Sequence, residues 1–136
     1  MTPDLIALHQ ELLALEHEAI WRFETIAARS TSARKRGQAS AQAHRKVRDR
    51  LREALLLAGT DPVTAQPGYD SAQLNSDDSM STGAQETLKN LVALYLGLVA
   101  RTREDERAAF VSDVANASVE IVSWGGQPQP FPGLDN

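Results

Sequence analysis

Apolar residues recur at three- and four-residue spacing through most of the chain, which is the period of a helix with one buried face. The first such run begins behind Thr2 and Pro3, a typical helix start. Its apolar positions are Leu5, Leu8, Leu12, Leu13, Ala19, Ile20, Phe23, Ile26 and Ala27. Only Glu16 interrupts this stripe. The Ser-Thr-Ser segment at 30–32 then offers a stop for this helix and an N-cap for the next.

A second helix is predicted from Ala33 to Ala58, and Gly59 is its expected C-terminal glycine. Gly37 weakens its beginning, because glycine inside a helix costs about 1 kcal/mol relative to alanine. His44 is the polar member of its inner stripe, whose other positions are Ala41, Val47, Leu51, Ala54, Leu55 and Ala58. Both long helices therefore carry one polar residue on an apolar face.

The segment from Thr60 to Ser81 has prolines, a glycine and polar residues without a sustained period, so we interpret it as a connection of about twenty residues. Helical hairpins usually need only about 2–8 linking residues. A connection this long can follow the roughly 37 Å length of a 25-residue helix. It predicts that the second and third helices run parallel.

Two further helices are expected, at Thr82–Thr102 and Glu104–Trp124. Their predicted inner positions are Leu88, Leu91, Val92, Tyr95, Leu98 and Val99 in one, and Phe110, Val114, Ala117, Ile121 and Trp124 in the other. A Gly-Gly pair at 125–126 closes the last helix. We expect one helical domain at 1–126 and an extended or disordered Pro-rich tail at 127–136.

The predicted fold class is all-α. The predicted connectivity is two antiparallel helical hairpins joined by a long crossover between helices 2 and 3. This is the connectivity of a ferritin-like four-helix bundle. The 136 residues suit a single domain, and the few aromatic side chains leave a core of Ala, Leu, Val and Ile. The absence of cysteine excludes disulfides, zinc–thiolate sites, iron–sulfur clusters and thiol nucleophiles. No run approaches the roughly 20 apolar residues of a membrane span, so we expect a cytoplasmic protein without a membrane partner.

Glu16 and His44 are predicted to meet in the core. Glu16 lies about fifteen residues before the expected turn near Thr31, and His44 lies about thirteen after it, so antiparallel packing brings them level. An unpaired buried carboxylate would cost several kcal/mol, which favours a hydrogen-bonded pair that sets helix register. The alternative is a pocket for a small polar ligand, with Tyr95 and Glu120 completing the candidate core site.

Four stretches carry a resemblance to a known family. They are the segment 14–21 (Ala-Leu-Glu-His-Glu-Ala-Ile-Trp), the segment 43–51 with Ala-His-Arg followed by Arg48, Asp49 and Leu51, the segment 61–69 with Asp-Pro-Val, Ala65 and Tyr69, and the segment 93–100 with Ala-Leu-Tyr and Leu-Val-Ala. In order and spacing they resemble an actinobacterial ferritin-like domain family of unknown function. The resemblance implies a helical bundle but no reaction. The family pattern has an acidic residue one heptad before the helix-three tyrosine, where this chain has Leu88.

A di-iron centre in a ferritin-like bundle needs a Glu from each of two helices and a Glu-x-x-His pair from each of the other two. Ala41 stands three residues before His44, and Ser123 stands three after Glu120. Only Glu16, His44 and Glu120 remain of six ligands, so we expect no di-metal centre and assign no cofactor. Gly97 could be a gap that admits a ligand, but close helix packing is the favoured interpretation.

The remaining candidates lie outside the core stripes. His17 points about 100° away from Glu16, and His9 is interpreted as a surface histidine. Arg45 and Arg48 could form the rim of a pocket beside His44. Trp21, off the main stripe, could contribute to an exposed apolar patch and a homodimer.

Eight of the fourteen Lys and Arg residues fall between Arg34 and Arg52, which raises a nucleic-acid interface as an alternative. The cations spread over several faces without interleaved aromatics, so a solvated, partly paired surface is favoured. We therefore predict a non-catalytic structural, binding or assembly module with a degenerate di-metal site. The alternatives are a divergent enzyme that binds a metal or small ligand through Glu16 and His44, and an anionic-partner binder through helix two.

Overall fold

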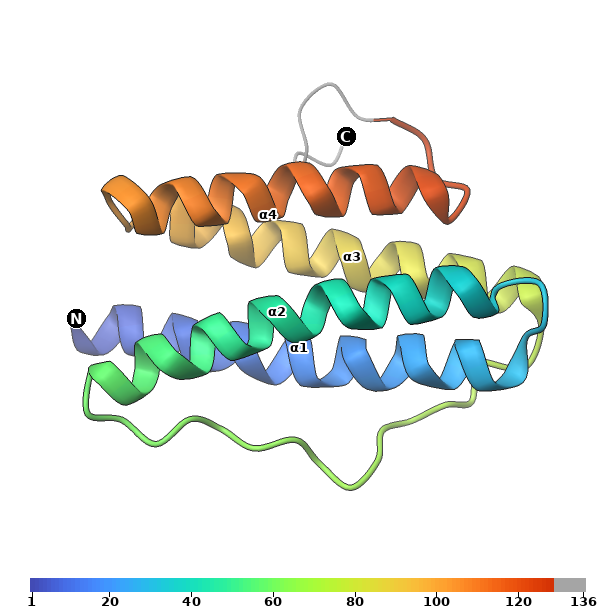
Figure 1. The fold of residues 1–136 in the computed structure, drawn as a ribbon, viewed down its shortest axis with the longest axis horizontal. Helices are drawn as coiled ribbons and strands as arrows, with labels where there is room; N and C mark the ends of the chain where they lie inside the picture. Colours follow the sequence, from blue (N-terminus) through green and yellow to red (C-terminus); the bar gives the residue numbers. More distant parts are fainter. Residues whose placement is uncertain (129–136) are drawn as a thin grey trace.

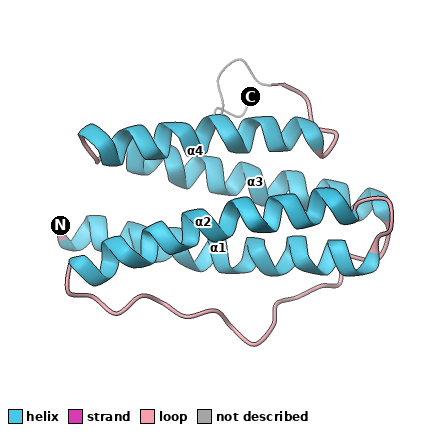
Figure 2. Ribbon diagram, in the orientation of Figure 1, coloured by secondary structure: helices cyan, strands magenta, loops and turns pink. Residues whose placement is uncertain are grey.

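The computed structural model describes residues 1–128 and contains four helices. They are α1 (Pro3–Arg29), α2 (Arg34–Leu57), α3 (Asp77–Val99) and α4 (Glu104–Ser123). No strand occurs within residues 1–128, and Figure 2 shows helices joined only by loops. The prediction of an all-α chain with four helices is confirmed.

The helices lie in two pairs. α1 packs most extensively against α2, and α3 packs most extensively against α4, while α1 also contacts α3. The colours of Figure 1 show the chain reversing direction inside each pair, whereas residues 58–76 link the two pairs by running along the length of the bundle on its outer side, beside α1 and α2. α3 consequently begins near the end where α1 finishes (Figure 1).

The core is continuous and aliphatic, with a few aromatic rings. Its largest fully buried side chains are Trp124, Tyr95, Phe23 and Phe110. Most positions predicted from the helical period are buried. The exceptions are Ala58, which is exposed, and five residues that are only partly covered, namely Leu5, Leu8, Ala54, Val99 and Val114. Leu74, which lies in the connection rather than in a helix, is 1% exposed and joins the same cluster.

α3 begins five residues before its predicted start and ends three residues before its predicted end. Ser76 and Ser79 form a capping box, in which each side chain accepts from the other's backbone N–H at 3.1 Å. Two acidic residues in the first turn add a favourable interaction with the helix dipole. The polar cluster interpreted as loop is therefore a helix start, and Met80 and Ala84 extend the buried stripe.

The first pair of helices crosses closely at Gly37. A Cβ atom at this position would lie 2.8 Å from the carbonyl oxygen of Phe23 and 3.0 Å from the backbone nitrogen of Ala27. The glycine thus permits contact between the α1 and α2 backbones, which explains a residue that intrinsic helix propensity disfavours. Gly59 and Gly125 adopt φ of 78° and 92° after α2 and α4, as expected of C-terminal glycines.

The connection between α2 and α3 is held against α1 by side-chain contacts. Gln10 bonds Asp61 and Val63, donating to the carbonyl of the first and accepting from the backbone N–H of the second, both at 2.8 Å. The Trp21 and Tyr69 rings lie 5.6 Å apart. Trp21 is half-buried, so the exposed patch expected around it is covered by the connection.

None of the helices in residues 1–128 is long and apolar enough to cross a membrane. The predicted Pro-rich tail lies almost wholly outside the described residues, which end at Pro128.

Candidate functional site

The structure brings Glu16, His44, Tyr95 and Glu120 together, one residue from each helix. His44 Nδ1 lies 2.7 Å from Glu16 Oε2, and His44 Nε2 lies 3.0 Å from Glu120 Oε1. The Tyr95 hydroxyl donates to the other oxygen of Glu16. We call these four side chains the core tetrad.

The tetrad lies mainly inside the bundle. Glu16 and Tyr95 are 0% exposed and His44 is 2% exposed, whereas the Glu120 side chain is 17% exposed. The hydrogen-bonded series therefore runs from the interior at Tyr95 to partial solvent contact at Glu120. No buried side-chain nitrogen or oxygen within residues 1–128 is without a partner.

The tetrad depends on a proton held by His44. Both ring nitrogens face carboxylates, which only accept, so both nitrogens must carry a hydrogen. Burial alone would lower the pKa of His44, but the hydrogen bonds and charges of Glu120 and Glu16 outweigh it and raise the pKa to about 10. Burial, together with the charge of Glu16 and its hydrogen bond, raises the pKa of Tyr95. At neutral pH the ring is an imidazolium and the tyrosine is neutral.

Aromatic packing fixes the imidazolium in place. The Phe23 ring lies 5.4 Å from the His44 ring and stacks at 5.9 Å on Trp124. The indole Nε1–H of Trp124 donates to Ser40 Oγ at 3.2 Å, one helical turn before His44 on α2. The guanidinium of Arg36 covers the indole at 5.0 Å. His44 therefore has little freedom to turn toward a new ligand.

A di-metal centre does not fit the residues present. Ala41 and Leu88, at two of the positions where a ferritin-like site needs carboxylates, are buried apolar residues. Ser123 stands in the histidine position and donates instead to the carbonyl of Glu120 in its own helix. Within residues 1–128 no three His, Asp or Glu side chains are grouped so that they could hold a metal ion. Glu16 and Glu120 occupy opposite nitrogens of one ring, so their oxygens diverge.

The two arginines considered as a pocket rim lie elsewhere. Arg45 pairs with Glu24 and lines a hollow between α1 and α2 that includes Ala41 but none of the tetrad. Arg48 pairs with Asp49 at 2.9 Å. Gly97 lies in a separate hollow on α1 and α3, where an added Cβ would meet Leu8 at an ordinary 3.7 Å.

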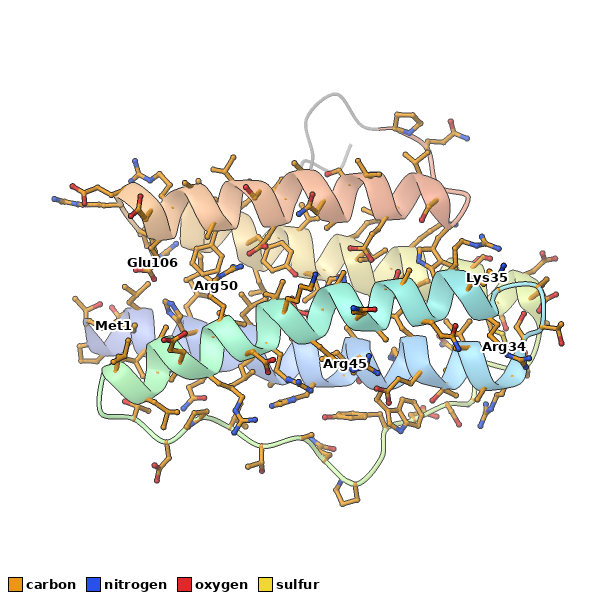
Figure 3. The ribbon with its side chains drawn as sticks, viewed as in Figure 1. Met1, Arg34, Lys35, Arg45, Arg50 and Glu106 are labelled. Carbon is orange, nitrogen blue, oxygen red and sulfur yellow. The ribbon has the colours of Figure 1, made fainter. Side chains whose placement is uncertain are left out.

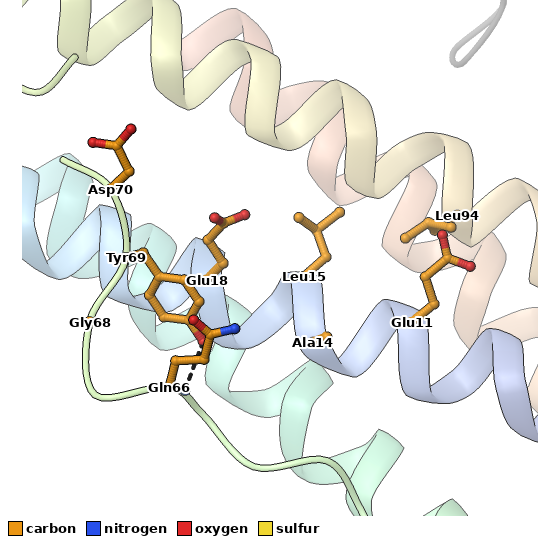
Figure 4. Close-up of a pocket in the computed structure, with 9 residues that line it drawn as sticks. All are labelled: Glu11, Ala14, Leu15, Glu18, Gln66, Gly68, Tyr69, Asp70 and Leu94. Atoms are coloured by element: carbon orange, nitrogen blue, oxygen red, sulfur yellow. Dashed lines mark hydrogen bonds between the residues drawn. The ribbon is translucent and has the colours of Figure 1, made fainter. Parts of the chain in front are cut away.

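Another open hollow lies where α1, α3 and the connection meet (Figure 4). Glu11, Glu18 and Asp70 give it an acidic rim, and the Tyr69 hydroxyl at its side accepts from the backbone N–H of Gln66 at 3.1 Å. No tetrad residue lines this hollow. It is a surface feature, separate from the core.

Three further titratable residues, His9, Asp113 and His17, are buried although the sequence did not predict their burial. His9, expected on the surface, is 1% exposed; it donates to the Leu5 carbonyl at 2.8 Å and bonds Glu106 at 3.0 Å. Asp113 is 7% exposed and pairs with Arg50 of the basic stretch on α2. The spacing along the sequence does place His9 and Asp113 on the buried helical faces. His9 is seven residues before Glu16, and Asp113 is three after Phe110 and four before Ala117. His17, expected off the core, is 9% exposed and donates to the Val63 carbonyl at 3.0 Å.

The cations of α2 are largely engaged by the protein itself. Arg34 donates to the Ala27 carbonyl at 2.9 Å, and Arg36 donates to the Ser123 carbonyl at 3.0 Å. Arg50 lies 5.2 Å from the centre of the Phe110 ring in addition to its ion pair. Figure 3 shows Lys35 and Arg34 at one end of the helix and Arg45 near its middle.

Comparison with known proteins gives a fold and a family. The chain is similar to a conserved hypothetical protein, rv2844, from Mycobacterium tuberculosis, whose crystal structure aligns with a TM-score of 0.80. The alignment covers 92% of this chain and 98% of that one at 18% identity, so the likeness concerns the fold alone. No curated protein matches the chain. A family described as a domain of unknown function, DUF4439, matches residues 7–136, and the chain belongs to this family.

Proposed function

We propose that the chain is a ferritin-like bundle in which a protonated histidine has taken the place of a di-metal centre, and that it serves as a non-catalytic structural, binding or assembly module. The observation that carries this proposal is the engagement of both nitrogens of the His44 ring by Glu16 and Glu120. The connectivity in Figure 1, with one long crossover between two helical pairs, supports the ferritin-like assignment.

The alternative of an enzyme that uses Glu16 and His44 is less well supported. A reacting molecule would have to touch side chains that are 0% and 2% exposed, and it would have to displace hydrogen bonds that are already satisfied. A nucleic-acid interface on α2 would compete with the contacts that Arg34, Arg36 and Arg50 make inside the protein. A cytoplasmic location remains a prediction.

Metal content tests the first part of the proposal. The protein would be produced in medium supplemented with iron and manganese, purified without chelators and examined by elemental analysis. We expect well under one metal ion per chain, because the donor oxygens of Glu16 and Glu120 diverge from the ring. About two metal ions per chain, retained through gel filtration, would overturn the proposal.

Apolar replacement tests the structural role. We expect the free energy of unfolding of the triple variant Glu16→Met, His44→Met, Tyr95→Phe to lie within about 1 kcal/mol of the wild-type value or above it. The three fully buried members of the tetrad are replaced, and the Glu120 side chain, which remains, is partly exposed to solvent. Tyr95 is included because Glu16→Met alone would leave its hydroxyl without an acceptor. The single variant His44→Met should lose about 3–5 kcal/mol, because it leaves Glu16 buried without its cation.

A matched control is His17→Met, which removes a buried histidine of α1 outside the tetrad together with its hydrogen bond to the Val63 carbonyl. It should cost no more than about 1 kcal/mol. Equal losses for the single and triple tetrad variants would contradict a purely structural role. A tetrad variant that folds normally but loses a bound small molecule found in the wild type would favour the pocket alternative.

A further inference from the structure

The two helical pairs face each other along two sides, α1 with α3 and α2 with α4, and these sides are built differently. The backbones of α1 and α3 approach more closely than those of α2 and α4. At Gly97 of α3, for example, an added Cβ would lie 3.7 Å from the Leu8 side chain of α1. We call the α2–α4 side the seam, and longer side chains have to bridge it.

Polar contacts bridge the seam. They join Arg36 to the Ser123 carbonyl, Ser40 to Trp124, His44 to Glu120, and Arg50 to Asp113. Between α1 and α3, by contrast, the bond from Tyr95 to Glu16 is the one hydrogen bond that joins the two helices within the described part of the chain. The seam is therefore the more polar of the two sides.

The middle of the seam buries little apolar surface. Ala117 of α4 stands four residues after Asp113 and three before Glu120, so it faces α2 together with them. On α2, the apolar residue between the two bonded positions is Val47. Both apolar side chains are small, and the hydrophobic contribution to stability grows with the area buried. The middle of the seam is thus held mainly by its two ionic contacts.

The two ends of α4 are held by aromatic rings. Near its beginning, the Phe110 ring lies 5.9 Å from the His9 ring of α1. At its end, Trp124 stacks on Phe23, which also belongs to α1. Both rings of α4 are almost completely buried. Separation of the whole helix would expose this large aromatic area, whereas a local opening in the middle would not.

The ionic side chains over the middle of the seam reach solvent. The Arg50 side chain is 39% exposed and the Glu120 side chain is 17% exposed. Each can rotate outward into water, which replaces part of what the ion pair loses. Glu16, on the other side of the His44 ring, is 0% exposed and also accepts from Tyr95, so it has no such path. Of the two carboxylates that hold the ring, only Glu120 can leave.

We propose that Arg50 and Glu120 form a gate in the middle of the seam, and that its transient opening admits water and small solutes to the Nε2 side of His44. The bonds that join His44, Glu16 and Tyr95 stay intact while the gate is open. The open form is rare, because it leaves the partners of both gate residues facing only water. The inference goes beyond the proposed role of the bundle, since it concerns how solvent reaches the core.

Exchange of the two ring N–H hydrogens of His44 with water tests the gate in the unaltered protein. The full chain would be labelled with ¹⁵N in histidine and followed by NMR at neutral pH. We expect the Nε2 hydrogen to exchange roughly tenfold faster or more than the Nδ1 hydrogen, because only Nε2 faces the gate. Equal rates would mean that one larger opening exposes both nitrogens, and they would overturn the proposal. Faster exchange at Nδ1 would overturn it as well.

A single engineered thiol gives a second measurement, since the chain has no cysteine of its own. Ala117→Cys places a thiol beneath the gate. The matched control is Ala19→Cys, because Ala19 is 0% exposed and its spacing from Leu8 and Leu15 places it on the α1–α3 side. Both variants would be treated with methyl methanethiosulfonate at several urea concentrations below the unfolding transition.

We expect the thiol at position 117 to react roughly tenfold faster or more than the thiol at position 19 in the absence of urea. Its rate should depend little on urea, because a local opening exposes little surface, whereas the rate at position 19 should rise steeply. Similar rates with the same steep dependence on urea would show that only global unfolding exposes either site, and would contradict the gate.

Removal of a gate residue tests which side chains form it. Arg50→Gln, added to Ala117→Cys, should raise the rate at position 117 several-fold, because the closed form loses its ion pair with Asp113. The control Arg48→Gln should leave that rate unchanged, because Arg48 pairs with Asp49 of its own helix. A rate that ignores Arg50→Gln would remove this arginine from the gate and overturn the proposal. Metal content enters none of these measurements, so the gate and the proposed function can fail separately.

Discussion

Raising the pH should destabilise the protein in a window that His44 defines. The pKa of the His44 ring is raised from 6.5 to about 10 in the folded protein, because the hydrogen bonds and charges of Glu120 and Glu16 outweigh the effect of burial. The unfolded chain holds the same proton only below about pH 6.5. Between these values folding requires a proton that the unfolded state has already released.

The sign and size of the effect follow from this difference. A raised folded-state pKa gives stability that is fully present below pH 6.5 and is lost as the pH rises through about 10. One proton changes the free energy of unfolding by about 1.4 kcal/mol per pH unit, so the full window corresponds to roughly 5 kcal/mol. This is a large share of the stability of a small domain.

Other groups also titrate near the upper end of the window, so the measurement needs a reference protein. The triple variant Glu16→Met, His44→Met, Tyr95→Phe lacks all three buried tetrad members but keeps the surface groups. Urea unfolding of both proteins, followed by circular dichroism at pH 6, 7, 8, 9 and 10, gives their difference in unfolding free energy at each pH. The pKa of Tyr95 is raised, so its own contribution would fade only above the ordinary tyrosine range.

We expect the wild type to lose stability relative to the triple variant steadily from pH 6.5 to pH 10. A difference that stays level across this range would refute the reasoning. It would mean that the folded group of Glu16, His44 and Glu120 holds no more protons than the unfolded chain across this range, so that one of the two contacts of His44 lacks a hydrogen.

Two further predictions concern the helices that hold the tetrad. Gly37→Ala should destabilise the fold by about 1–3 kcal/mol in thermal or urea unfolding, although alanine is the better helix former, because the new Cβ would lie 2.8 Å from the Phe23 carbonyl oxygen. An increase in stability, as helix propensity alone predicts, would show that the two backbones do not approach this closely. Ser76→Ala should cost about 1 kcal/mol by removing the acceptor for the Ser79 backbone N–H. Protection of the first α3 amides in hydrogen exchange should fall with it, and unchanged protection would contradict the assigned start of α3.

The four helices and most of their inner faces could be predicted from the sequence because burial imposes a simple period. The two interruptions at Glu16 and His44 were informative for the same reason, since a polar residue inside an apolar stripe needs a partner. Their pairing followed from their distances to the turn. Glu120 was selected only by its place in a metal-binding pattern, and its bond to His44 depends on how α4 packs.

Other features of the structure could not be predicted from the helical period of the apolar residues. The close approach at Gly37 depends on the crossing of α1 and α2, which one sequence does not specify. The start of α3 was missed because serine and aspartate are favoured both in loops and in caps, so local composition does not separate them. His9 was assigned to the surface because its partner, Glu106, lies on a helix 97 residues away.

The tetrad explains how a bundle can keep inward-facing acids without a metal. In a di-metal centre the carboxylates converge on cations held between the helices. Here the imidazolium of His44 is the positive group, and its two N–H bonds point away from each other, so Glu16 and Glu120 lie on opposite sides of the ring. Restoring the missing ligands at positions 41, 88 and 123 would therefore be insufficient by itself. The ring, held between Phe23 and its two carboxylates, would also have to lose a proton and release one partner before a cation could bind.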